Sequence, residues 1–475
     1  MGFRVVVHRV RSGVVESSAD RQALRLGSSR ALIGCIAMTA MFMGTIDATI
    51  VATALPAIHR SLHSSINWAG WTITVYGLGV VISMPTAGRV SDQLGRRRVF
   101  FWAIAIFTVA SLLCGFATDI YMLIVFRALQ ALGGGAMTPT AAGIVSEHFG
   151  KDRDRALGLF SSIAAVGQLT GPILGGVLVG YWNWHWIFFV NVPVGVVLLA
   201  LVIRFIPESA TRGAQHIDVL GIALLTGFIL FATFAITDLG NRGTNPFAFV
   251  IVPAVVASAT LIAFIGHNRR APDPFIPSRL LRGRGFGIVN VLNFLWGFAG
   301  WGMATLVPLY AEDRFRLPAL AAGSLLSARA VTMAVVGFFA AMSLRRSGYR
   351  LPMFVGYAAT AAGMVMMSFG PRGVGPFGWL SIAAGITGIG NGLASPASRN
   401  AGLHLVPDEV AATTGLRFMF NNIGTIFSVS IVTAILNRSS TPGLTQSHLI
   451  WIMAAIIAGV MVPLVRGIPE HKGAW

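Results

Sequence analysis

Charged residues are scarce in this chain of 475 residues and make up 11% of it, whereas a typical soluble domain has about 25%. So small a charged fraction cannot cover the surface of a water-soluble globule of this length, which excludes a soluble enzyme and a disordered chain. Cysteine occurs only twice, at Cys35 and Cys114, and both fall in apolar stretches. A secreted fold held together by disulfides is therefore excluded as well.

Apolar residues, at 55% of the chain, dominate the sequence instead. A membrane span needs about 20 of them in a row, and such stretches recur from residue 31 to residue 466. Backbone groups inside a bilayer must be paired within the segment, so each stretch should be a helix. We expect interruptions at Pro193 and Pro253. The predicted spans are residues 31–56, 69–88, 99–117, 121–145, 157–180, 186–206, 217–237, 247–266, 288–310, 321–343, 352–369, 377–397, 412–436 and 449–466.

The few charges are distributed unevenly between the connecting segments. The chain has 35 basic and 17 acidic residues, a net charge of +18. Successive connecting segments lie on alternate sides of the membrane. The segments on one side hold 26 of the basic residues, and those on the other side hold 6. Basic residues favour the cytoplasmic side of a membrane protein, so we predict an even number of spans with both termini in the cytoplasm. The positive charge is thus an orientation signal, and we expect no nucleic-acid partner.

Internal repetition divides the chain into two halves. A glycine and arginine pattern recurs at a constant offset, so that Gly88, Gly95 and Arg97 match Ala341, Gly348 and Arg350. We therefore predict an all-α polytopic membrane protein whose 14 transmembrane helices are arranged as six, two and six. The predicted units are a basic cytoplasmic tail at 1–30, a six-helix bundle at 31–206, two central helices and a cytoplasmic linker at 207–287, a second six-helix bundle at 288–466 and a cytoplasmic tail at 467–475. Translation that starts inside the first segment is an alternative to the tail.

One acidic residue lies deep inside a predicted span. At about 1.5 Å per residue, Asp47 is about 14 Å from the outer end of its span and Arg127 about 9 Å from the outer end of another, so the two can pair. A carboxylate in the bilayer costs at least ~2.5 kcal/mol, which favours a functional role. Burial disfavours its charged form and a guanidinium favours it, and these opposed effects suit a group that loads and releases a proton. The alternative is a static ion pair that holds two helices together.

The segment 88–98 carries an ordered motif of glycine, aspartate and arginine. We expect its two glycines to let the chain turn sharply between helices, and Asp92 to lie at a helix N-terminus or to pair with an arginine. The motif resembles the signature loop of the major facilitator superfamily. That resemblance implies the major facilitator fold and a cytoplasmic latch that acts in conformational change, formed by Gly88, Asp92, Gly95, Arg96 and Arg97.

Three further segments resemble the fourteen-span drug:proton antiporters of that superfamily. Residues 47–56 resemble the signature of the first span, residues 127–135 the motif whose arginine is implicated in proton transfer, and residues 167–176 the antiporter motif. Small residues four apart allow close helix approach, and a proline within a helix bends it. The antiporter motif supplies Gly167, Gly171, Pro172, Gly175 and Gly176. Together the segments assign proton coupling to Asp47, with Arg127 tuning it.

Thr49, Gln130 and Arg329 are candidate cavity residues. Arg329 either lines the cavity or extends outward to the membrane surface. Three arginines within spans against one aspartate argue against a pocket for dications, and leave neutral or weakly anionic amphiphiles as substrates. His59 and His63 have no third ligand nearby, so we expect no metal. No phosphate-binding glycine loop occurs, so we expect the proton gradient as the energy source and no cofactor.

These features predict a secondary transporter, not an enzyme, in the bacterial plasma membrane. It would export amphiphilic drugs or toxic compounds in exchange for protons, by alternating access between its two halves. We expect a monomer whose partners are small amphiphiles, protons and the lipid bilayer. A dedicated exporter of one metabolite, lipid or antibiotic is the alternative. A polytopic membrane enzyme or sensor is more remote, because it predicts polar clusters at one membrane face that the sequence does not show.

Overall fold

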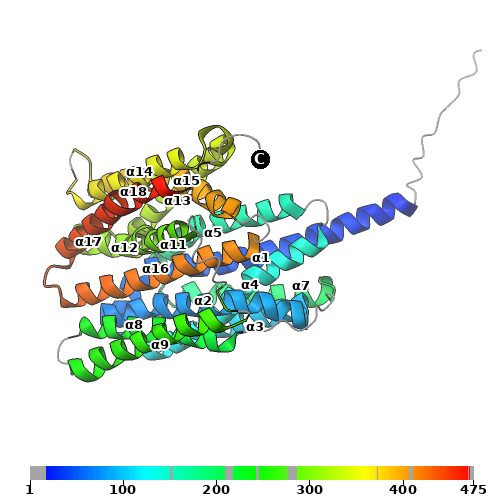
Figure 1. Ribbon diagram of the computed structural model, residues 1–475, viewed down its shortest axis with the longest axis horizontal. Helices are drawn as coiled ribbons and strands as arrows, with labels where there is room; N and C mark the ends of the chain where they lie inside the picture. The colour runs from blue at the N-terminus through cyan, green and yellow to red at the C-terminus, as the bar shows by residue number, and fades with distance from the viewer. Residues whose placement is uncertain are drawn as a thin grey trace, which may run out of the picture.

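The computed structural model of the chain is a bundle of helices (Figure 1). The structure describes residues 18–149, 153–208, 218–241, 245–272, 274–276, 286–371, 373–405, 410–468 and 470. Much of the predicted tails at 1–30 and 467–475, and part of the predicted linker, lie outside these residues. The predicted domain boundaries stay predictions.

The first half consists of five long helices followed by one helix that is broken in two. α1 packs along α5, while α2 and α3 both pack along α4, which is therefore central to this half. The side chain of Asp119 begins α4 by accepting a hydrogen bond from the Met122 N–H at 2.9 Å, which pairs a backbone group that a helix start leaves free. The elements are α1 (Ser18–Ser61), α2 (Ile66–Leu94), α3 (Arg96–Gly115), α4 (Ile120–His148), α5 (Arg153–Tyr181), α6 (Trp186–Phe189) and α7 (Asn191–Phe205).

Two helices separate this half from a second, similar one. The inserted pair is α8 (Val219–Leu239) and α9 (Val252–Arg270), with the short π-helix η2 (Phe247–Ile251) leading into α9. The second half begins with a helix that a π-helical turn interrupts. Its elements are α11 (Phe286–Leu295), η3 (Trp296–Trp301), α12 (Gly302–Phe315), α13 (Ala319–Ser347), α14 (Arg350–Ser368), α15 (Pro376–Leu405), α16 (Val410–Arg438), α17 (Pro442–Ile456), η5 (Ile457–Met461), α18 (Val462–Leu464) and η6 (Val465–Gly467).

Within the described residues, 12 helical segments are long and apolar enough to cross a membrane. The two predicted spans outside this set correspond to α5, whose described apolar part is Val166–Tyr181, and to α15. The 30 residues of α15 include many glycines, serines and asparagines, which lower its hydropathy. The chain is thus an all-helical, multi-pass membrane protein, and the count of fourteen spans stays a prediction.

The prolines expected to interrupt the apolar stretches lie in the first turns of helices. Pro193 is the third residue of α7, which only Val190 separates from α6. Pro253 is the second residue of α9, a helix that directly follows η2. Proline is tolerated there because the N–H groups of a first turn have no partner within the helix. Both interruptions are therefore local, and the helical run continues past each of them.

The structure repeats the pattern seen in the sequence. Gly95, between α2 and α3, and Gly348, between α13 and α14, both have positive φ angles, 92° and 70°. Glycine adopts this backbone conformation without the steric cost that a side chain brings. The arginines that follow make matching contacts, because Arg97 donates to the Ile203 carbonyl and Arg350 to the Ile468 carbonyl, each at 2.7 Å. The two halves are therefore structural repeats at these turns as well as in sequence.

Successive long helices run in opposite directions, so the chain enters and leaves the bundle at one end (Figure 1). We call this the terminal end, and the other the far end. The halves meet where α2 packs on α16 and α5 on α13. At the far end Arg60 forms a 2.9 Å ion pair with Glu312, and the Thr433 hydroxyl donates to the Asn67 side chain at 3.2 Å. The two halves are thus joined at the far end.

The inserted pair covers the seam between α2 and α16. The Trp71 indole N–H donates to the Thr237 hydroxyl at 2.8 Å, which ties α2 to α8. The Asn437 side chain donates to the Gly240 carbonyl at 2.9 Å, which ties α16 to the end of α8. In Figure 1 the green α8 and α9 lie at the lower edge of the bundle, below α2 and α16. The pair therefore contacts both halves rather than forming a separate unit.

Asp218 clamps the terminal end of this pair. Its carboxylate accepts hydrogen bonds from the N–H groups of Gly221 and Phe275, both at 2.8 Å, and contacts the His267 ring at 2.7 Å. Burial opposes ionisation of Asp218, but these hydrogen bonds outweigh it and lower its pKa. A lowered pKa means that the carboxylate stabilises the fold above its ordinary pKa and loses this contribution as the pH falls through the folded value.

We expect Asp218→Asn to reduce the free energy of unfolding by about 1–3 kcal/mol at pH 7, because asparagine keeps the helix cap but loses the charge-assisted bonds. Thermal unfolding in detergent at a series of pH values checks this. The difference between variant and wild type should shrink toward acid pH, where both side chains are uncharged. A difference that stays constant with pH would contradict it.

Candidate functional site

The residues that carry charge chemistry meet inside the first half. Asp47 on α1 and Arg127 on α4 are enclosed, with side chains 0% and 1% exposed, and Arg127 Nη1 lies 2.8 Å from Asp47 Oδ2. The pair predicted from depth along the two helices is therefore present. Two amides complete the surroundings of the carboxylate. Gln130 Nε2 and Asn191 Nδ2 both donate to Asp47 Oδ1, at 2.9 and 3.0 Å.

Arg127, Gln130 and Asn191 all contact Asp47 as donors. Arginine has no acceptor, and the two amides turn their NH₂ groups toward the carboxylate. A protonated carboxyl group would need an acceptor in one of these positions. These three donors suit the ionised form of a carboxylate and enclose it within the bundle.

A second layer fixes the arginine and the glutamine. Arg127 Nε donates to the Thr72 carbonyl at 3.2 Å, and the guanidinium lies 4.0 Å from the centre of the Tyr76 ring, a cation–π contact from α2. Gln130 accepts from Arg127 Nη1 at 2.6 Å and donates to the Ser111 hydroxyl on α3 at 2.8 Å. The charge cluster (Asp47, Arg127, Gln130 and Asn191) thus joins α1, α4 and α7 and is supported by α2 and α3.

Two of the three candidate cavity residues have other contacts. Gln130 binds the carboxylate instead of lining a cavity. Thr49 donates to the backbone carbonyls of Thr45 and Ile46 on its own helix, both at 3.1 Å, and lies against Gly171 of α5. For Gln130, which is fully buried, the assignment to a cavity was wrong. For Thr49, which is partly exposed, it stays a prediction.

Arg329 is the third candidate, and it turns inward. Its side chain is 6% exposed. Nη2 donates to the Gly300 carbonyl at 2.8 Å, and the guanidinium lies 5.6 Å from the centre of a ring of Trp301. Of the two alternatives, extension to the membrane surface is therefore wrong.

The antiporter motif of α5 has two packing faces. Gly167, Gly171 and Gly175 lie against α1, where a Cβ at Gly171 would overlap Thr49 Oγ1. Gly176 faces α13 of the other half, and the Pro172 carbonyl lies beside Gly323. The motif therefore lets α5 approach both the helix that carries Asp47 and the second half.

In the segment 88–98 only one of the two glycines makes a turn. Gly95 separates α2 from α3, whereas Gly88 lies inside α2 with open space where its Cβ would be. The expectation that both glycines turn the chain was wrong. Asp92 lies in the last turn of α2, not at a helix N-terminus, and its Oδ1 is 3.4 Å from Arg96 Nη2.

Arginines of this segment hold the terminal ends of neighbouring helices. Arg96 Nη1 donates to the Gly143 carbonyl of α4 at 2.5 Å and lies 3.5 Å from Glu147. Arg97 lies 3.5 Å from Glu208, just after α7, in addition to its bond to the Ile203 carbonyl. These contacts connect α2, α3, α4 and α7 within the first half.

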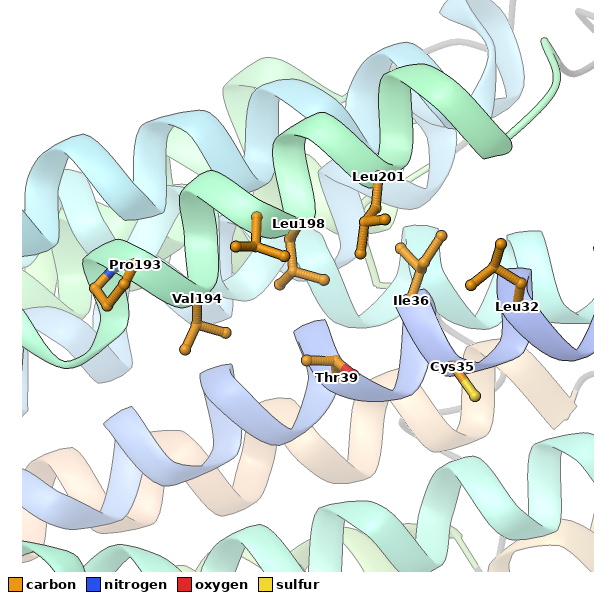
Figure 2. A pocket seen from close by; sticks show the side chains of 9 residues that line it. Leu32, Cys35, Ile36, Thr39, Pro193, Val194, Leu198 and Leu201 are labelled. Atoms are coloured by element: carbon orange, nitrogen blue, oxygen red, sulfur yellow. The ribbon is translucent and has the colours of Figure 1, made fainter.

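A groove of about 460 Å³ lies between α1 and α7 (Figure 2). Figure 2 shows Ile36 of α1 and Leu201 of α7 near each other across it, with Leu32 and Leu198 beside them. Its lining is apolar apart from Cys35 and Thr39 and includes no charged side chain. Charge chemistry therefore belongs to the enclosed cluster and not to this groove.

Sequence reasoning missed three residues of the site. Asn191 stands as a polar residue between apolar ones in the run 186–194, and that isolation was the signal that could have found it. Tyr76 and Ser111 carry no such signal, because hydroxyl-bearing residues are common in membrane helices and only packing brings these two to the cluster.

The fold has solved counterparts. A crystal structure of the peptide transporter POT in complex with sulfate superimposes with a TM-score of 0.65 at 16% identity, covering 92% of this chain and 95% of that one. This likeness shows that the chain shares the fold of that protein, with two repeated bundles of apolar helices. The chain belongs to the Major Facilitator Superfamily, whose sequence model matches residues 37–323 and 289–474. The resemblance inferred from the segment 88–98 is therefore confirmed. Membership of this family indicates a transporter and not the enzyme or sensor that was the remote alternative.

Relatives with names that refer to multidrug transport or resistance match most of the chain. The multidrug transporter protein MdtP of Bacillus subtilis is 28% identical over 88% of this chain and 77% of its own length. A multidrug resistance protein B homolog of Mycobacterium tuberculosis is 29% identical over 90% of this chain and 79% of its own length. Multidrug resistance protein 3 of Bacillus subtilis is 30% identical over 74% and 69%.

Proposed function

We propose that this protein is a multidrug efflux transporter that exports amphiphilic compounds in exchange for protons. The observation that carries the proposal is the enclosed carboxylate of Asp47, held by Arg127 in a membrane helix. The relatives are named as multidrug transporter and multidrug resistance proteins, which supports amphiphilic drugs as the substrate class. A charge is costly at this depth and is kept where it serves transport.

In the proposed mechanism, Asp47 alternates between two states. The ionised state is enclosed by donors, as described above. In alternating access the two halves rock against each other around a site near the bilayer midplane. The accompanying movement of α1 against α4 would withdraw Arg127 and Gln130 from the carboxylate. Without those donors the neutral form becomes favoured, and Asp47 takes up a proton. Return of Arg127 would expel the proton on the other side.

The topology follows from the same proposal. We infer fourteen spans, with α5 and α15 crossing the bilayer beside the twelve most apolar segments, and with the terminal end in the cytoplasm of a bacterial plasma membrane. The excess of basic residues at that end supports this orientation. The latch segment at 88–98 would then lie on the cytoplasmic side, where Arg96 and Arg97 fix the ends of α4 and α7. We expect the protein to work as a monomer.

Everted membrane vesicles with a pH-sensitive dye test the function. Addition of an amphiphilic substrate should dissipate an imposed proton gradient in vesicles that contain the protein, and not in vesicles without it. A response to a broad set of amphiphiles supports multidrug efflux, whereas a response to one compound alone would favour a dedicated exporter. No response to any compound would overturn proton coupling.

A further inference from the structure

Arg329 is a buried cation in the second half, on α13, and is not part of the charge cluster. It lies ten residues after the start of α13, about 15 Å along the helix, and its side chain is 6% exposed. A guanidinium at such depth is costly unless something compensates its charge. For Arg127, a carboxylate and two carbonyl groups do so. Arg329 has to be explained differently.

The second half offers Arg329 almost no acids. Between Asp313 and Asp408 the sequence contains 8 arginines and no aspartate or glutamate. Over the part of the chain that the structure describes, no carboxylate lies within 4 Å of Arg329. Among the described residues, its side chain has one hydrogen-bond partner, the Gly300 carbonyl bound by Nη2, whereas a guanidinium has five N–H donors. Most of its donors are therefore available to a ligand.

Arg329 lies between the turn η3 and the helix α15. The Gly300 carbonyl belongs to the π-helical turn η3, a feature that often marks functional sites in helices. On the other side, the Arg329 backbone packs closely on Gly388 of α15, and the Thr332 hydroxyl of α13 donates to the Gly385 carbonyl at 3.0 Å. The side chain thus projects from a fixed backbone toward η3, with the Trp301 ring beside it.

We propose that Arg329 and Trp301 form a substrate subsite for amphiphiles with an anionic head group, a carboxylate or a sulfonate. The guanidinium would bind the head group through its free donors, and the indole would pack against the apolar body. The substrate would supply the negative charge that the second half lacks. This inference rests on the proposed function and names its substrate class.

Binding of two probes that differ only in charge tests the subsite. The probes are dansylglycine, which has a carboxylate, and its uncharged amide, measured by dansyl fluorescence with full-length protein in phosphatidylcholine nanodiscs. These zwitterionic lipids supply no anionic lipid that could compete. Wild type should bind dansylglycine about tenfold more tightly than the amide, as expected for one charge-assisted contact. Arg329→Gln should remove this preference, and Arg329→Lys should keep most of it.

Two further variants keep the test decisive. Arg269→Gln removes an exposed arginine at the end of α9 and should leave the preference unchanged. Trp301→Leu should weaken both probes equally, which separates the ring from the charge even where Arg329→Gln does not fold. Equal binding of both probes by wild type, or a preference that survives in Arg329→Gln, overturns the inference.

The dye assay in vesicles separates failure of the subsite from failure of the proposed function. If the vesicles move protons with neutral amphiphiles while the probes bind equally, the subsite is wrong and proton-coupled export stands. If wild type prefers dansylglycine but no amphiphile moves protons, the subsite stands and proton-coupled export is wrong.

Discussion

Replacing Asp47 by asparagine should reduce substrate-driven proton movement to the background of vesicles that lack the protein. Asparagine has nearly the shape of aspartate and keeps an oxygen that can accept from Arg127, whose Nη1 lies 2.8 Å away. It cannot take up a proton. Its NH₂ group would face one of the amide donors, at a cost of about 1–3 kcal/mol, so the amount of folded protein in the membrane must be measured beside the dye response.

Asp119→Asn is the matched control for this substitution. Asp119 caps α4 at the far end by accepting a hydrogen bond from the Met122 N–H, and asparagine caps helices equally well. The control makes the same chemical change outside the charge cluster, so proton movement should equal that of wild type. If Asp47→Asn also retained it, Asp47 would not be the carrier, and its pair with Arg127 would be the static ion pair considered above.

The Asp47–Arg127 pair was predictable because a helix fixes depth. The rise per residue is constant, so counting from the ends of two spans places both side chains at similar levels without knowledge of packing. The same helical geometry predicts the position of Gln130. It follows Arg127 by three residues and must therefore lie on the same face of α4. Thr49 follows Asp47 by two and must point elsewhere. The sequence therefore specifies the relative direction of side chains around a helix as well as their depth.

Other parts of the site depend on packing that no local pattern encodes. Asn191 reaches Asp47 only because α7 begins beside α1, and Ser111 reaches Gln130 only because α3 packs along α4. The sequence predicted a turn at both Gly88 and Gly95, and only Gly95 forms one. Glycine is compatible with a helix as well as with a turn, so its presence alone does not distinguish the two. Membership of the superfamily could be inferred from the ordered motif at 88–98, because several residues at fixed spacing are rarely combined by chance.

Each of the fourteen apolar stretches predicted from hydropathy lies in a helical part of the structure. Twelve of the described helical segments are long and apolar enough to cross a membrane, so the number of crossings is less certain than the positions of the helices. The less apolar α15 contains the glycines that allow close contact with α13 and α14, such as Gly390 and Gly392, whose Cβ positions would overlap backbone atoms of the neighbouring helices. Small residues that favour helix association lower the hydropathy on which span prediction relies. The composition that lets α15 pack closely is therefore also what makes its crossing harder to predict.

The packing of α1 on α5 leads to the second large expected effect. Gly171→Ala should lower the thermal stability of the protein in detergent and slow substrate-driven proton movement. The added Cβ would overlap Thr49 Oγ1 and lie 3.0 Å from the Ile46 carbonyl, so α1 and α5 must separate. Overpacking of this kind costs about 1–3 kcal/mol. Because Asp47 lies on the displaced part of α1, the geometry of the charge cluster should change as well.

Two companion variants show whether the contact itself causes the effect. Gly266→Ala adds the same methyl group to α9, where nothing lies within 4 Å, and alanine favours a helix by about 1 kcal/mol over glycine. It should leave stability unchanged or raise it. Thr49→Ala combined with Gly171→Ala removes the nearest clash but not the one with the Ile46 carbonyl, so it should restore part of the lost stability. Such a rescue measures coupling between the two positions. If Gly171→Ala were as stable as wild type, α1 and α5 would tolerate a wider separation, and the antiporter motif would not act by holding them close.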